Sequence, residues 1–160
     1  MNFNISSNSK GSAMAEIIIG SSIMLVGILA ISVAFNTYLN YALTNQKNVE
    51  STYLMQEGLE AMSFLRDIGW TNNFGSLSTT TTYYLVWSGS RWATTTTEQY
   101  VDGSFLRSIS VTDVKRDANS DIATSGTYDP DIKLVTVSVS YLLGQATTTK
   151  SMSRYIVNIR

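Results

Sequence analysis

An uninterrupted apolar run near the amino terminus limits what this chain can fold into. Residues 17–35 read IIIGSSIMLVGILAISVAF and include no charged side chain. At about 1.5 Å per residue, a helix of this length spans roughly the 30 Å hydrocarbon core of a bilayer. The run therefore predicts one membrane-spanning helix, with the rest of the chain folded outside the hydrocarbon.

The composition removes several kinds of chemistry. The 160 residues include no Cys and no His, which excludes a Ser-His-Asp triad, a thiolate nucleophile, a disulfide and the usual structural zinc site. The 11 basic and 12 acidic residues form no runs, so there is no electrostatic footprint for nucleic acid. Carboxylate, lysine or serine chemistry stays open, but no nucleophile and base pair can be named. We expect a protein that is not an enzyme and has no cofactor.

A short polar leader precedes the apolar run. It ends at Gly11, and the stretch Ser12-Ala13-Met14-Ala15 then leads to a single carboxylate, Glu16. Burying such a carboxylate at the membrane centre costs on the order of 2.5–3.5 kcal/mol, so it should reach the interface or find a cation. A secretory signal peptide is the competing interpretation, with Ser32-Val33-Ala34 as its cleavage site, but its apolar region would be shorter.

The order of Gly11, Glu16 and the apolar run resembles the precursors of type IV pilins and type II secretion pseudopilins. Residues 56–61 and 66–70 also resemble the helix end of PilV-like minor pilins. In that family a prepilin peptidase cuts after the Gly and methylates the new amino terminus, and the fifth mature residue is a Glu. The resemblance implies cleavage after Gly11, methylation of Ser12 and an assembly role for Glu16. Residues 12–15 depart from the usual Phe-Thr-Leu-(Ile or Val). The only proline is Pro130, so no proline kink is expected in the helix.

The resemblance also implies a function and a location. The chain would be a structural subunit of a type IV pilus or type II secretion-like filament, anchored once in a bacterial inner membrane with its carboxy-terminal part outside the cytoplasm. After assembly it would lie in a cell-surface or periplasmic filament. Its partners would be other pilins or pseudopilins, the peptidase, membrane lipid and an inner-membrane platform with a separate ATPase. An alternative remains open: a single-span surface binding or adhesion module that does not polymerise and needs neither Gly11 nor Glu16.

The helical pattern continues beyond the apolar run to Ile68, and Gly69 is a suitable left-handed stop. Apolar or small residues recur at steps of four and three and should line one face: Leu54, Gly58, Ala61, Leu65 and Ile68. The chain thus divides into a leader (1–11), a membrane half of the helix (12–35), an amphipathic half (36–69) and a remainder (70–160).

Residues 70–160 read as a small antiparallel sheet. Strand-like segments occur at 83–87, 105–111, 134–142 and 153–159, and the threonine runs between them read as loops or strand edges. Core faces are predicted for three of them: Phe105, Arg107, Ile109 and Val111; Val135, Val137, Val139 and Tyr141; and Tyr155, Val157 and Ile159. Because these faces need cover, we predict an α+β, pilin-like fold in which the sheet packs on the back half of the long helix.

Two loops hold candidate binding residues. Asp117, Asn119 and Asp121 place oxygen atoms at alternate positions, as a calcium loop does, although a polar hairpin loop explains them equally and is the preferred interpretation. Trp87 and Trp92 flank residues 88–91. They could form an exposed aromatic loop for a polymer, a surface or single-stranded nucleic acid, but we expect Trp87 in the core and a simple turn after it.

Overall fold

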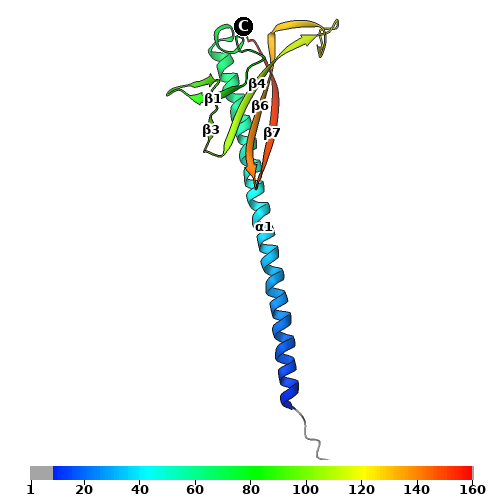
Figure 1. The fold of residues 1–160 in the computed structure, drawn as a ribbon. Helices are drawn as coiled ribbons and strands as arrows, with labels where there is room; N and C mark the ends of the chain where they lie inside the picture. Colours follow the sequence, from blue (N-terminus) through cyan, green and yellow to red (C-terminus); the bar gives the residue numbers. More distant parts are fainter. Residues whose placement is uncertain (1–8, 160) are drawn as a thin grey trace, which may run out of the picture. The chain divides into compact units, whose positions relative to one another are not determined.

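The computed structural model describes residues 9–159 and has an α+β architecture. One long helix, α1 (Ser9–Ile68), is followed by a π-helical turn, η1 (Trp70–Phe74), and by an antiparallel sheet of seven strands (Figure 1). Residues 1–8 of the predicted leader lie outside the described residues. The chain divides into two units, of which the first ends at Asn45 and the second begins at Gln46. Each unit is described by itself.

The sheet is built around two long central strands. Its path runs β2-β1-β4-β6-β7, and the short strands β3 and β5 both pair with β4. The threonines of residues 94–95 and 147–149 lie in β2 and β7, the two outer strands of that path, which confirms their prediction as strand edges. The bounds are β1 (Tyr83–Trp87), β2 (Trp92–Thr95), β3 (Tyr100–Val101), β4 (Phe105–Arg116), β5 (Ile122–Ala123), β6 (Thr127–Leu143) and β7 (Ala146–Val157).

The helix ends where the sequence predicts, but with a different geometry. The last helical residue is Ile68, and Gly69 follows with φ 159° and ψ 120°, which is not the left-handed conformation expected there. The reason is the next element, because the Gly69 carbonyl accepts the backbone N–H groups of Asn73 and Phe74, the last two residues of η1. The chain therefore passes from the helix into η1 without a left-handed cap.

The carboxy-terminal part of α1 packs against one face of the sheet, as predicted. Met55, Leu59 and Met62 are at most 4% exposed, and together with the valines of β6 they belong to one hydrophobic core. Four-and-three spacing puts these three residues on one helix face. The buried face is thus centred on them rather than on the predicted stripe.

The predicted helix stripe is correct in its middle and wrong at one end. Gly58, Ala61 and Leu65 are buried, and Leu54 is partly buried against the core. Ile68 is 40% exposed because it is the last residue of α1 and the chain turns away after it. At Gly58 the helix backbone comes so close to the sheet that a Cβ there would lie 2.8 Å from Val137 Cγ1.

Strand alternation predicts the core faces of β4 and β6 correctly but not that of β7. The predicted inward residues of β4 and β6 are all buried. In β7, however, Tyr155 and Val157 are 47% and 45% exposed, whereas Ile156 is buried. The register with β6 is the cause: Tyr155 pairs with Leu134 and so shares its outward face. A shift by one residue exchanges the two faces of a strand.

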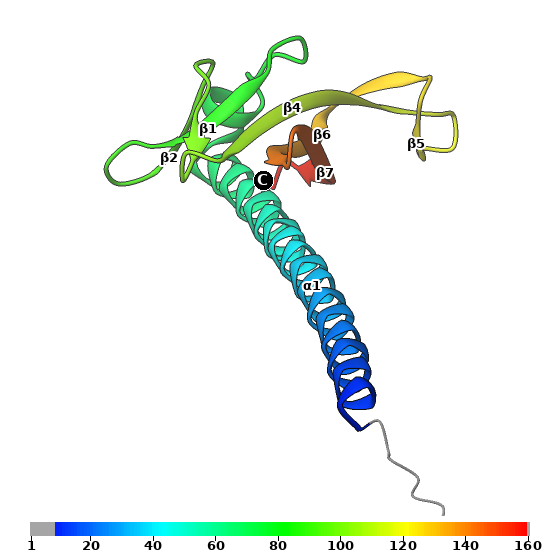
Figure 2. The same ribbon diagram turned by 60° about the horizontal axis from the view of Figure 1, so that its bottom comes forward.

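The outward face of the sheet is covered by hydroxyl groups. Across β6 and β7, three pairs of hydroxyl oxygens lie 2.8 Å apart: Thr136 with Ser153, Ser138 with Ser151, and Ser140 with Thr149. Pairs of this kind add to the stability of an antiparallel ladder. Beyond them, β4 and β6 extend together as an arm that carries β5 (Figure 2). The pairing register of β4 and β6 shifts between Asp113 and Val114, at the base of this arm.

Candidate functional site

The amino-terminal unit is an apolar helical surface without cover. Every residue from Gly11 to Leu43 is exposed, including Ile23 at 69% and Ile31 at 71%. A helix that is apolar on all sides belongs in a membrane or inside an assembly. The helix is long and apolar enough to cross a membrane once.

The predicted processing residues lie at the start of this helix. Gly11, Ser12 and Glu16 are all exposed residues of α1. Ser12 and Glu16 are four residues apart and therefore lie on the same helix face, one turn from each other. A Cβ at Gly11 would meet no atom within 4 Å. The Gly11–Ser12 peptide bond is in the first turns of α1, where the N–H groups lack intrahelical acceptors and the helix opens most easily.

Serine side chains of this helix donate hydrogen bonds to backbone carbonyls of the same helix. The hydroxyl groups of Ser22 and Ser32 donate to the carbonyls four residues earlier, at 2.7 and 2.9 Å, and Ser21 donates to Ile18 O at 3.0 Å. In hydrocarbon an unsatisfied polar group costs several kcal/mol. These three serines are therefore compatible with a membrane, and Glu16 is the one charged group between Gly11 and Gln46.

The predicted calcium loop forms a polar turn. Asp117 Oδ1 accepts the backbone N–H groups of Asn119 and Asp121, at 2.8 and 3.0 Å. The loop lies at the end of β4, before β5, and so confirms the hairpin interpretation. Among the described residues, no three acidic, His or Cys side chains are grouped to hold a metal ion. Calcium binding by Asp117, Asn119 and Asp121 stays a prediction that only a titration can decide.

An ion pair ties this arm together next to the loop. Arg116 Nε donates to Asp129 Oδ2 at 2.6 Å, and Arg116 Nη1 donates to Ser120 O at 2.6 Å. The hydrogen bond from Arg116 lowers the pKa of Asp129 below its usual 3.8, and the backbone N–H of Asp131 lowers it further. The arm is thus held by a carboxylate that stays ionised through the physiological range.

The prediction for the tryptophan pair is wrong in one respect. Trp87 is 56% exposed, whereas Trp92 packs partly buried against the core. The two rings meet edge to face, 5.3 Å between centroids, and the Arg107 guanidinium lies 5.3 Å from the Trp92 ring. Because Trp92 occupies the place beside Arg107, Trp87 is left at the surface. Residues 88–91 form the expected turn, closed by Ser88 N–H donating to Arg91 O at 2.9 Å.

Sequence reasoning missed the partners of two buried cations. Arg107 is 3% exposed and donates from Nη1 to the Glu57 carboxylate and to Leu54 O on α1. Lys133 is 5% exposed and donates to Asp113 Oδ1 at 3.1 Å. The available signal was a charge within an apolar strand face, because a buried charge requires a partner. The sequence shows the charge but not which carboxylate meets it.

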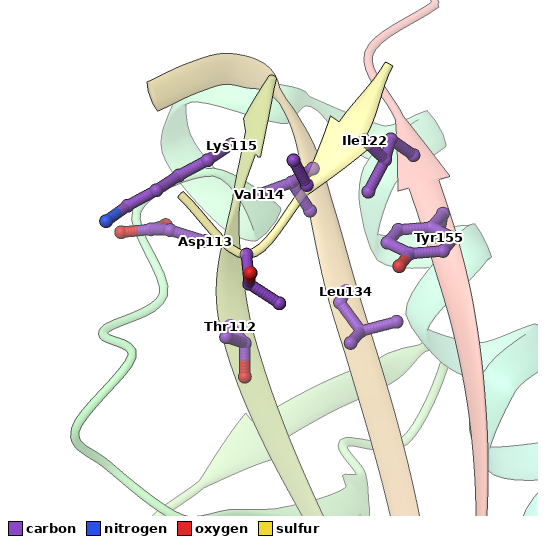
Figure 3. A pocket seen from close by; sticks show the side chains of 9 residues that line it. Thr112, Asp113, Val114, Lys115, Ile122, Leu134 and Tyr155 are labelled. Atoms are coloured by element: carbon purple, nitrogen blue, oxygen red, sulfur yellow. The ribbon is translucent and has the colours of Figure 1, made fainter. Parts of the chain in front are cut away.

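A concave site lies on the outward face of the sheet, at the base of the arm. It has a volume of about 480 Å³, and Figure 3 shows Ile122 and Tyr155 close together above Leu134, with the Lys115 ammonium directed away from them. Val114 and Ile132, both at most 5% exposed, are buried at this end of the sheet but are not part of the main core. The site is a shallow apolar hollow in a secondary cluster of side chains.

Comparison of the chain with protein families, with curated proteins and with solved structures finds no match.

Proposed function

We propose that the chain is a membrane-inserted filament subunit of the type IV pilin or pseudopilin kind. It would be processed after Gly11, methylated on Ser12 and assembled through the exposed apolar half of α1. One observation carries the proposal: a single carboxylate, Glu16, stands five residues after Gly11 in a helical surface that has no other charge up to Gln46.

The charge of Glu16 raises the free energy of a helix inserted in a membrane. In hydrocarbon an unpaired carboxylate is destabilising, and a cation relieves the cost. Cleavage after Gly11 would create a primary amine on Ser12, and the amine of a neighbouring copy could reach Glu16 when two such helices pack side by side. A plain membrane anchor has no use for this arrangement, since any uncharged residue at position 16 would anchor as well.

The second unit suits a subunit whose sheet stays outside the membrane. Its helix face from Met55 to Leu65 is already covered by the sheet, so the side chains left for contacts between subunits are mainly those of the preceding apolar half. Gly20 and Gly27 lie in that half, and a Cβ on either would meet no atom within 4 Å. Small residues of this kind allow close approach of helices.

The test is the intact mass and amino-terminal sequence of the membrane-extracted chain, expressed with and without a prepilin peptidase. We expect a chain that begins at Ser12 and carries one added methyl group only when the peptidase is present. Gly11→Ala should block processing, and Gly20→Ala is the matched control, because neither substitution meets a neighbouring atom in the structure. A chain that stays uncut would leave the non-polymerising surface module, and one cut after Ala34 would be a secreted protein.

A further inference from the structure

One end of the second unit carries a notch lined by both apolar and polar side chains, with a lysine in its wall. The notch has a volume of about 470 Å³ and is formed by α1, by β3 and the turn into β4, and by the β6–β7 hairpin. Tyr100 and Leu142, which line it, are each 58% exposed. The name Lys47 notch stands for this site, whose lining includes Lys47, Tyr100, Leu106, Ser140, Leu142 and Thr147.

The ammonium group of Lys47 is fixed but not saturated. Its Nζ donates to the Leu142 carbonyl at 2.6 Å, which uses one of its three N–H donors. Within the described residues no other hydrogen bond of Lys47 is seen. Two donors are thus left for an acceptor from outside, and the hydroxyls of Ser140 and Thr147 lie in the same notch.

The position of Lys47 in the chain indicates where that acceptor comes from. Residues 17–35 cross the hydrocarbon, and no charged side chain occurs in the eleven residues that follow, up to Gln46. Tyr38 and Tyr41, both at least 70% exposed, precede Lys47 by nine and six residues. Tyrosines concentrate at the membrane interface. Lys47 is therefore the first cation on the far side of the membrane span.

We propose that the Lys47 notch binds the headgroup of a phospholipid in the leaflet from which the chain emerges. Lys47 Nζ donates to the phosphate, and Tyr100 and Leu142 bury their apolar surface beside the glycerol region. The carboxylates Glu50 and Asp102 lie near Lys47 and Gly103 in the chain, so the notch has no excess of positive charge that would favour anionic lipids. The site therefore selects the phosphate that zwitterionic and anionic lipids share. The inference rests on the proposed membrane insertion.

The experiment measures where the notch lies relative to the bilayer. Since the chain has no Cys, a nitroxide label can be placed on Leu142→Cys alone, in the full chain reconstituted into phosphatidylcholine vesicles. The matched label is Tyr128→Cys, an exposed position in the same strand, about 46 Å away along β6. The measurement is how strongly each label is relaxed by oxygen, which concentrates in lipid, and by a nickel chelate, which stays in water. We expect oxygen to relax the label at position 142 more strongly, and the nickel chelate to relax the label at position 128 more strongly.

A pair of lysine variants tests the role of the ammonium group. Lys47→Gln should lower the ratio of lipid-bound to water-exposed label at position 142 about tenfold, from the loss of one charge-assisted hydrogen bond to the phosphate. Lys150→Gln removes the same charge from β7, outside the notch, and should leave the ratio unchanged. An equal effect of both variants would contradict a headgroup site at Lys47.

The remaining outcomes separate the notch from the anchor. If the chain floats with the vesicles but both labels report water, the headgroup site is overturned and the membrane anchor stands. If the chain does not float, the proposed membrane insertion itself fails. Shielding of position 142 that appears only at high protein density would mean that a second copy covers the notch. If added inorganic phosphate makes the label at position 142 accessible to water, the site would be assigned to free phosphate instead of lipid.

Discussion

The guanidinium of Arg107 on β4 donates a hydrogen bond to the carboxylate of Glu57 on α1, fifty residues earlier in the chain. The arginine side chain is 4% exposed and the glutamate side chain 46% exposed, so a buried cation is paired with a half-hydrated anion. The pair connects helix and sheet beside Gly58.

Removal of the carboxylate should destabilise the second unit. Glu57→Ala leaves the Arg107 guanidinium buried with only Leu54 O and the Trp92 ring beside it. We expect a loss of about 1–3 kcal/mol in the free energy of unfolding, because a buried donor loses its acceptor. Denaturant unfolding of the chain in detergent measures the change. Glu60→Ala, another exposed carboxylate of the same helix, should have little effect, and equal losses would contradict the pairing.

A methyl group added at Gly58 should also destabilise the protein. The new Cβ would lie 2.8 Å from Val137 Cγ1 and 3.3 Å from Arg107 Cδ, so helix and sheet must move apart. Overpacking of this kind costs about 1–3 kcal/mol. Gly27→Ala, in the same helix with no atom within 4 Å, should be neutral or stabilising because Ala is the better helix former. Adding Val137→Ala to Gly58→Ala should recover part of the loss, and independent effects in this double-mutant cycle would exclude the contact.

Replacement of Asp117 should loosen the arm whether or not calcium binds. Asp117→Ala removes the acceptor of two backbone N–H groups, and we expect a loss of about 1 kcal/mol. Hydrogen exchange of Asn119 and Asp121 measures it. A calorimetric titration with calcium then decides the metal question. A heat of calcium binding that is lost in Asp117→Ala and Asp121→Ala but kept in Asp102→Ala would establish the site. If the unmodified chain gives no heat, the turn is a structural element only.

Stability should fall at alkaline pH through Tyr84. Burial raises the pKa of this tyrosine above its usual 10.0, and the nearby Glu98 carboxylate raises it further. The folded state therefore holds the phenol proton more tightly than the unfolded state. This contribution is complete below pH 10.0 and is lost as the pH rises towards the folded pKa. Between about pH 9 and 12, the melting temperature of Tyr84→Phe should fall less than that of the unmodified chain. The exposed-site variant Tyr128→Phe should decline as the unmodified chain does.

Periodicity predicted the parts of the fold that depend on one face being buried. The alternation of Val135, Val137 and Val139 leaves no choice of face, because the opposite residues are Thr136 and Ser138. The long helix and its end at Ile68 follow from the apolar run and from Gly69. These features are local, so a single sequence contains them.

The errors arise where partners from elsewhere in the chain decide the outcome. Tyr155 and Val157 alternate as a core face would, yet Tyr155 pairs with the outward-facing Leu134, and Ile156 is the buried residue. Trp87 and Trp92 pair across β1 and β2, but only Trp92 packs against the core, next to Arg107. For the candidate site, Gly11, Ser12 and Glu16 all lie exposed on α1, but geometry within one chain cannot reveal an amine contributed by another.

The hydrogen bond from the Tyr141 hydroxyl to Asn48 Oδ1 joins residues ninety-three positions apart, at 2.7 Å. Its consequence concerns the order of events during synthesis. The strands β4, β6 and β7 form from neighbouring hairpins and can pair early, because short loops close quickly. The helix, although made first, has to wait for β6 before its apolar face is covered. Folding of the second unit is therefore completed only after β6 has been translated, and until then the face from Met55 to Leu65 needs protection from aggregation.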